Sequence, residues 1–191
     1  MKKTLSNRRG YSLVELIIVL AIVAVLAVMS LVSLTILKTA RAKDACVKTG
    51  SEINELKTKS MNMTPSDTNY DGYALMIYKD SSNGKYHLAQ VLHKKPVGGA
   101  TDAYDPVPGE DVTISSSVVV KFTGYNYGVA TKYEDKSPGT KTGSGEAGPL
   151  YICFDKRGNC YSGYGTISFY KRNGTLTSKI NIGSNGSIDV R

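Results

Sequence analysis

The hydrophobic and polar positions of this chain follow three successive patterns. From residue 13 to residue 37 the chain is apolar, and Glu15 is the only charged residue there. From residue 42 to residue 63 small or apolar residues recur about every 3.5 positions between charged ones, which is typical of an amphipathic helix. After Pro65 short apolar runs alternate with turn residues. This order predicts an α+β protein, in which one long amino-terminal helix packs on an antiparallel, β-rich head at 65–191.

The helical pattern is continuous across the first two segments. No proline or glycine occurs between Tyr11 and Thr49, and Pro65 is the first proline of the chain. Gly50 weakens a helix without ending it. We therefore predict one helix from about Tyr11 to Met63, with one stripe of small and apolar side chains facing the head. The stripe comprises Ala42, Ala45 or Cys46, Thr49, Ile53, Leu56, Ser60 and Met63.

The two halves of this helix differ in their expected surroundings. At about 1.5 Å per residue, the apolar run reaches roughly 37 Å, which is enough to cross a bilayer. We expect 11–37 to span the membrane and 38–64 to be the amphipathic half. Lys2, Lys3, Arg8 and Arg9 precede the run and favour a cytoplasmic amino terminus.

The head is predicted to consist of short strands joined by tight turns. Asn83-Gly84, Asn173-Gly174 and Asn185-Gly186 are typical hairpin signals, and the last two would join a carboxyl-terminal meander. A Gly- and Pro-rich loop is expected before Asp111, and a second loop is expected at 134–149. The strands are predicted at 73–78, 86–92, 111–114, 118–122, 125–132, 165–170, 175–182 and 187–190.

Composition and charge narrow the class of protein. Charged residues make up 21% of the chain and hydrophobic residues 41%, which excludes a disordered tail or a multispan membrane protein. The net charge is +8, but four of the 24 basic residues precede residue 11. The remaining 20 basic and 16 acidic residues leave only +4. That excess does not by itself indicate nucleic-acid binding.

The three cysteines do not form a disulfide framework. Cys153 and Cys160 flank a tight turn, so a disulfide could join them across a hairpin. A bulge at Gly158 would instead shift the register and separate the two sulfurs. The sequence leaves both outcomes open. Cys46 is left over, as a small residue on the helix.

Candidate residues for chemistry are few. Asp67, Asn69 and Asp71 resemble the first half of a calcium loop, but Tyr78 stands where an EF-hand needs a bidentate glutamate. A turn explains the same residues, so they are a weak calcium candidate. His87 and His93 lie on or near a strand without metal-ligand spacing or a nucleophile elbow. We therefore expect no enzyme activity, no catalytic residue, no cofactor and no metal.

The segment Arg8-Arg9-Gly10-Tyr11-Ser12-Leu13-Val14-Glu15-Leu16, followed by the long apolar run, resembles the class III signal of type IV pilins and type II secretion pseudopilins. The resemblance implies a leader at 1–10, which prepilin peptidase removes between Gly10 and Tyr11 before methylating Tyr11. The family usually has phenylalanine and threonine where this chain has Tyr11 and Ser12. The resemblance also implies a single-pass protein of the cytoplasmic membrane that later joins an extracellular filament.

The same resemblance gives Glu15 a partner. In such filaments the glutamate pairs with the amino terminus of a neighbouring subunit. Cleavage after Gly10 would create a positive amine four residues before Glu15. A paired carboxylate is tolerated in an apolar setting and fixes register, whereas an unpaired one is destabilising. The alternative is a glutamate that only reaches back to the lipid headgroups.

The carboxyl-terminal third resembles minor pseudopilin H of type II secretion and related minor pilins, which implies a minor subunit near the filament tip. The residues that carry this resemblance are Ile152-Cys153-Phe154, Gly158, Gly165-Thr166-Ile167-Ser168-Phe169, Ile180-Asn181-Ile182 and Gly186-Ser187-Ile188.

We therefore interpret the chain as a structural subunit of a type IV pilus or pseudopilus. Its expected partners are other pilin subunits, prepilin peptidase, the inner-membrane assembly platform and, before assembly, membrane lipid. One alternative is a DNA-binding minor pilin, and the other is a membrane-anchored extracellular enzyme. The first rests on basic residues interleaved with aromatic ones near the carboxyl terminus. These are Lys156, Arg157, Lys171, Arg172, Lys179 and Arg191.

Overall fold

A computed structural model describes residues 12–94, 103–126, 131–136, 138 and 148–191, leaving out the side chains of 30–33 and 131–136. The chain divides into two compact units, Met1–Leu37 and Lys38–Arg191. The second unit contains the amphipathic half of the helix together with the head.

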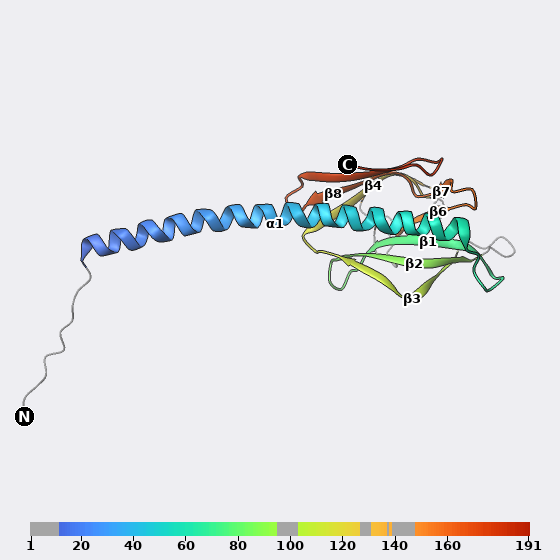
Figure 1. Ribbon diagram of the computed structural model, residues 1–191, viewed down its shortest axis with the longest axis horizontal. Helices are drawn as coiled ribbons and strands as arrows, with labels where there is room; N and C mark the ends of the chain where they lie inside the picture. Colours follow the sequence, from blue (N-terminus) through green and yellow to red (C-terminus); the bar gives the residue numbers. More distant parts are fainter. Residues whose placement is uncertain (1–11, 95–102, 127–130, 137, 139–147) are drawn as a thin grey trace, which may run out of the picture. The chain divides into compact units, whose positions relative to one another are not determined.

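The amino-terminal helix, α1, runs from Leu13 to Asn62 (Figure 1). Glu15 lies in its first turn and Lys59 in its last, and both charges complement the helix dipole. Pro65 has no backbone N–H and restricts the residue before it, so the helix ends just ahead of it. The prediction that one helix continues through the apolar segment and the amphipathic segment is confirmed.

The amphipathic half of α1 buries the predicted stripe. Ile53 and Leu56 are fully buried, and burying each such side chain contributes about 1.5–3 kcal/mol. Met63 is the exception. It follows the last helical residue and is 54% exposed, because the stripe ends where the helix ends. The buried positions are Ala42, Ala45, Cys46, Thr49, Ile53, Leu56 and Ser60.

Gly50 lies within the same buried surface. A Cβ atom at this position would be 3.1 Å from Cγ2 of Val190 and 3.8 Å from Cδ1 of Ile180. The glycine therefore lets the carboxyl-terminal strands approach the helix closely. This packing offsets the cost of about 1 kcal/mol that glycine brings to a helix interior.

Within the described residues, ten strands form two five-stranded antiparallel sheets. Sheet 1 has the order β3-β2-β1-β6-β7, and its strands are β1 (Tyr70–Lys79), β2 (Tyr86–Lys94), β3 (Ala103–Ile114), β6 (Leu150–Phe154) and β7 (Cys160–Ser162). Sheet 2 has the order β10-β9-β8-β4-β5, and its strands are β4 (Val118–Asn126), β5 (Thr131–Lys136), β8 (Tyr164–Lys171), β9 (Leu176–Ile182) and β10 (Ile188–Val190). The predicted β1–β2 hairpin and the carboxyl-terminal meander are confirmed.

The start of β3 differs from the prediction. A loop was expected before Asp111, but the strand begins at Ala103 and includes Pro106 and Pro108. Among the described strands β3 lies at an edge of sheet 1, and its pairing with β2 shifts register between Ala89 and Val91. An edge strand tolerates proline because only one side of its backbone has to pair.

The prediction for the segment after β4 is also wrong in part. A single strand at 125–132 was expected, but β4 ends at Asn126 and a separate strand, β5, forms at Thr131–Lys136 and pairs with β4. The start of the loop predicted at 134–149 therefore belongs to β5. The rest of that loop lies mostly outside the described residues.

The main core forms where α1 meets both sheets. In the second unit β1, β2 and β3 lie on one side of the helix and β4 and β8 on the other (Figure 1). The largest fully buried side chains come from all three layers: Ile53 and Leu56 from α1, Leu75, Ile77, Leu88, Leu150 and Ile152 from sheet 1, and Phe122, Ile167, Phe169 and Ile180 from sheet 2.

A second cluster lies on the other face of sheet 1. Successive side chains of a strand point to opposite faces, so Leu75 and Ile77 enter the main core while Ala74 and Met76 enter this cluster. Tyr104 and Tyr151 pack against it with their rings stacked at 3.8 Å between centroids. We call this surface the outer face of sheet 1. Its buried members are Ala74, Met76, Ala89, Val91 and Cys153.

Candidate functional site

The first turn of α1 contains the predicted assembly residue. The backbone N–H of Leu16 donates to the carbonyl of Ser12 at 3.1 Å, and Glu15 follows with an exposed side chain. A carboxylate here is favoured by the positive end of the helix dipole. Gly10 and Tyr11, the predicted cleavage and methylation residues, lie outside the described part of the chain.

The helix surface beyond Glu15 is apolar and uncovered. Every described side chain at 12–29 and 34–38 is exposed, and Leu13 is 74% exposed. A contiguous apolar surface of this extent is not stable in water, so it must contact lipid or another apolar surface. By length and composition, α1 can cross a membrane.

Two histidine–carboxylate pairs lie on the outer face of sheet 1. Nδ1 of His87 is 3.0 Å from the carboxylate of Asp111, and Nδ1 of His93 is 2.6 Å from that of Asp71. His93 is only 6% exposed, and its ring lies against Tyr104. The pairs connect β2 to β3 and to β1. The two carboxylates are 22 and 24 residues away from their histidines in sequence, so no local spacing of residues could predict these pairs.

The residues of the calcium candidate contact other groups of the head. The carboxylate of Asp67 accepts hydrogen bonds from the backbone N–H of Asn69 at 2.9 Å and from its side-chain amide at 2.8 Å. Asp71 pairs with His93 instead. Within the described residues, no group of three His, Cys, Asp or Glu side chains is placed to hold a metal. The alternative explanation, a turn between helix and sheet, fits these contacts.

The structure keeps the two cysteines of the possible disulfide apart. Cys153 pairs with Ser162 across β6 and β7, whereas Cys160 pairs with Phe154, because the register shifts between these pairs. Cys153 joins the outer cluster and Cys160 the main core, so their sulfurs lie on opposite faces of the sheet. No disulfide joins them. The register shift lies at Tyr161, between the two pairs, whereas Gly158 lies in the turn at φ 81°.

The basic residues near the carboxyl terminus are spread along the head. Lys156 donates to the carbonyl of Met63 at the end of α1. Arg172, in the β8–β9 turn, donates its backbone N–H to the carbonyl of Ser117 at 3.1 Å. The strand β8 separates the two turns by about 25 Å at 3.3 Å per residue. Lys156 and Arg172 therefore lie at opposite ends of β8, and Lys179 pairs with Ser168 on the strand between them.

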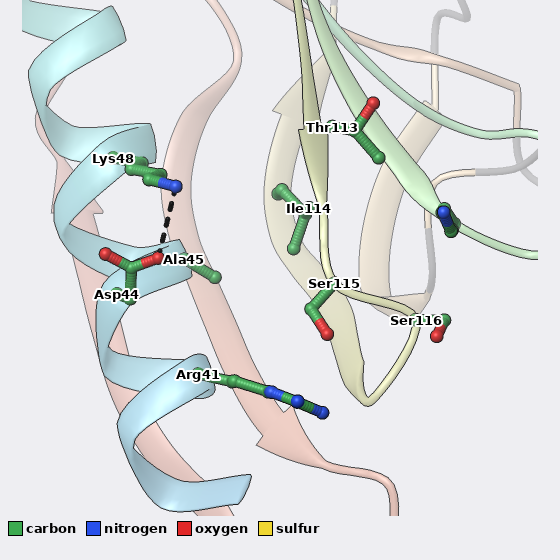
Figure 2. A pocket seen from close by; sticks show the side chains of 9 residues that line it. Arg41, Asp44, Ala45, Lys48, Thr113, Ile114, Ser115 and Ser116 are labelled. Carbon is green, nitrogen blue, oxygen red and sulfur yellow. Dashed lines mark ion pairs between the residues drawn. The ribbon is translucent and has the colours of Figure 1, made fainter. Parts of the chain in front are cut away.

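A basic cleft lies between α1 and the β3–β4 turn, and the sequence did not predict it. Its volume is about 400 Å³, and Figure 2 shows Arg41 directed from the helix toward the turn that contains Ser115 and Ser116. Lys48 forms an ion pair with Asp44 at 3.2 Å. The lining residues are Arg41, Asp44, Ala45, Lys48, Lys85, Thr113, Ile114, Ser115 and Ser116. They come from three distant segments, which explains why no motif pointed to the cleft.

Comparison with known proteins bears on the amino-terminal segment. The prokaryotic N-terminal methylation motif matches residues 5–31, a range that contains Gly10, Tyr11 and Glu15. No curated protein and no solved structure matches the chain. The motif implies processing by prepilin peptidase and assembly with other pilins, and together with the apolar helix it supports membrane anchoring before assembly. With the α+β pilin-like architecture, it indicates a type IV pilin-like or pseudopilin-type protein.

Proposed function

We propose that this chain is a structural subunit of a type IV pilus or secretion pseudopilus, cut between Gly10 and Tyr11, methylated at Tyr11 and assembled through α1. The observation that carries the proposal is the methylation motif at 5–31, which coincides with the start of α1, where Glu15 is the only charged residue of the apolar run 13–37. Before assembly the subunit is anchored in the cytoplasmic membrane with its amino terminus inside.

The charge of Glu15 supports a role in setting register. An ionised carboxylate among apolar helices is destabilising unless a positive group reaches it. Cleavage supplies that group as the new amine of Tyr11, and a neighbouring subunit docked in register brings amine and carboxylate together. Two apolar helices otherwise have little that fixes their offset, because lipid and neighbouring helix are similarly apolar.

Within this function we assign the chain to the minor subunits, which lie near a filament tip. The support is the glycine-punctuated carboxyl-terminal pattern. Gly158 and Gly186 lie in the β6–β7 and β9–β10 turns with φ angles of 81° and 75°. A Cβ atom on Gly186 would overlap the carbonyl oxygen of Gly158, so the two turns pack backbone against backbone.

Mass spectrometry of the subunit from sheared filaments tests the proposal. The mature chain should begin at Tyr11 and carry one added methyl group. Gly10→Arg should leave the ten-residue leader attached, whereas Asn7→Arg, which adds the same charge away from the cut, should be processed normally. A filament subunit that begins at any other residue would contradict the proposed processing.

A further inference from the structure

The basic cleft has the composition of an anion-binding site. Arg41, Lys48 and Lys85 contribute three positive charges against the one negative charge of Asp44, and Thr113, Ser115 and Ser116 are among the other lining residues. The hydroxyl of Ser115 lies 3.0 Å from that of Ser117. Guanidinium, ammonium and hydroxyl groups are the donors that bind phosphate oxygens. Asp44 is 63% exposed and pairs with Lys48, which leaves Arg41 and Lys85 as the cations set opposite the serine turn.

A neighbouring cleft extends this charge over the same end of the head. It shares Ser116 with the first cleft and adds Lys79 and Arg172 to the lining. Asp80 is close in sequence, but its carboxylate accepts hydrogen bonds from the backbone and hydroxyl of Ser82 and from Asn83. The backbone and hydroxyl bonds from Ser82 lower the pKa of Asp80 against the opposing effect of burial, so the carboxylate stays ionised and is held by its own turn. We call the two clefts together the basic end.

The basic end lies close along the chain to the apolar run. Arg41 follows Leu37 by four residues of α1, which rise about 6 Å along the helix axis. The headgroup region of a bilayer is roughly 5–8 Å thick on each side. Whatever the orientation of the head, Arg41 therefore lies within reach of the headgroups when residues up to 37 occupy the hydrocarbon.

We propose that the basic end binds the phosphate groups of anionic phospholipids on the surface of the membrane that anchors the subunit. The proposal rests on the membrane-anchored stage of the proposed function and adds a lipid partner for the head. Each Lys or Arg near an anionic surface strengthens attraction to it about fivefold, and Arg41, Lys85 and Lys79 act together on a surface that carries many phosphates. The contact would hold the head against the membrane until assembly withdraws the subunit.

Tryptophan quenching can measure this contact, because the chain contains no tryptophan. Ser81→Trp places one reporter in the exposed β1–β2 turn, beside the cleft but outside its lining. The full chain is reconstituted in phosphatidylcholine vesicles that contain a trace of headgroup spin-labelled lipid, and the phosphatidylglycerol fraction is raised stepwise. Quenching should increase with that fraction. In Arg41→Glu/Lys85→Glu the fraction needed for half-maximal quenching should rise at least about fivefold.

Matched controls separate a specific contact from general charge. Lys94→Glu carries the same charge change as Lys85→Glu at the opposite end of β2, about 30 Å away, and should leave quenching unchanged. Inorganic phosphate at matched ionic strength should not release the reporter. Equal effects of Lys85→Glu and Lys94→Glu would overturn the proposal. Release by free phosphate alone would assign the cleft to a soluble anion instead of lipid. Neither result concerns cleavage or filament assembly. The lipid contact can therefore be disproved while the proposed function, which mass spectrometry tests separately, stands.

Discussion

Nζ of Lys59 lies 3.1 Å from both carboxylate oxygens of Glu110, and so joins the last turn of α1 to the edge strand β3. The same ammonium donates to Oε1 of Gln90 at 2.7 Å and pairs with Glu55 at 3.1 Å. Burial lowers the pKa of Lys59, but the hydrogen bonds and charges of Glu110 and Glu55 outweigh it and raise the pKa. The amphipathic half of α1 is therefore anchored to sheet 1 by a charged group as well as by its apolar stripe.

Removing this group should destabilise the head. Lys59→Met should lower the free energy of unfolding by about 1–3 kcal/mol, because Gln90 and Glu110 lose a partner in a partly buried setting. Urea unfolding of the full chain in detergent, followed by tyrosine circular dichroism, measures this. Lys48→Met removes an ion pair whose partners are 55% and 63% exposed, and should change stability by less than about 0.5 kcal/mol. Equal losses in the two variants would contradict the anchoring role of Lys59.

Stability should depend on pH through Asp155, which organises the β6–β7 turn. Its carboxylate accepts hydrogen bonds from the backbone N–H groups of Arg157 and Asn159 at 2.9 and 2.8 Å, and from the Asn159 side chain at 3.0 Å. The side-chain bond from Asn159 is the main cause that lowers the pKa of Asp155, against the opposing effect of burial. A lowered pKa in the folded state contributes stability above the unfolded value of about 3.9, which is lost as pH falls through the folded value.

The variant Asp155→Asn keeps the acceptor oxygen but removes the charge. Its melting temperature should be below that of the wild type at pH 7, and the difference should shrink as the pH falls below about 4. A difference that stays constant down to pH 2 would show that the charge of Asp155 is not responsible.

The contact between the β6–β7 and β9–β10 turns predicts that alanine destabilises the chain more at Gly186 than at Gly174. Gly186→Ala must move the β6–β7 turn, because the added Cβ would overlap the carbonyl oxygen of Gly158. Gly174 has a similar φ of 84° but open space around it, so Gly174→Ala should cost only the backbone strain of about 1–2 kcal/mol. Thermal unfolding of both variants should show the larger loss for Gly186→Ala. Similar losses of melting temperature in the two variants would mean that the β6–β7 turn moves aside at little cost in stability.

The thiols should be present and poorly reactive in the folded chain. Burial raises the pKa of Cys160 to about 12 and that of Cys46 to about 11, and Cys153 is fully buried. Since the thiolate is the reactive form, alkylation at pH 8 should be at least about 100-fold slower in the folded chain than in urea. Mass spectrometry under non-reducing conditions should find three alkylated cysteines after unfolding. A single alkylated cysteine would instead reveal a disulfide between Cys153 and Cys160, which the register of β6 and β7 argues against.

Most of the fold could be predicted from the helical spacing of small and apolar residues and from the turn residues between strands. The stripe from Ala42 to Ser60 and the turns at Asn83-Gly84 and Asn173-Gly174 are local signals, because helix period and turn conformation depend on neighbouring residues. They predict α1, the β1–β2 hairpin and the carboxyl-terminal meander. Gly50, by contrast, was understood only as a weak point of the helix, since its contact with Val190 is set by tertiary packing.

The errors arose where tertiary pairing overrides local preference. Pro106 and Pro108 look like loop residues, yet the edge of a sheet accommodates them in β3. The faces of the sheet on which the sulfurs of Cys153 and Cys160 lie depend on a register shift, which a hairpin pattern in the sequence does not specify. The pairing of His93 with Asp71 and the basic cleft likewise combine residues from separate elements. The amino-terminal motif was recognisable because it is contiguous, and the family match covers it.

The central claim is that α1 assembles into a filament through the charge of Glu15, and the most direct measurement compares subunit amounts in membrane and sheared-filament fractions. Glu15→Val should be cleaved and inserted normally, because it makes the helix more apolar and leaves Gly10 unchanged, but it should be scarce in filaments. Glu15→Asp, which keeps the charge, should recover part of the incorporation. Incorporation of Glu15→Val equal to that of the wild type would contradict the claim and reduce Glu15 to a residue that only contacts the headgroups.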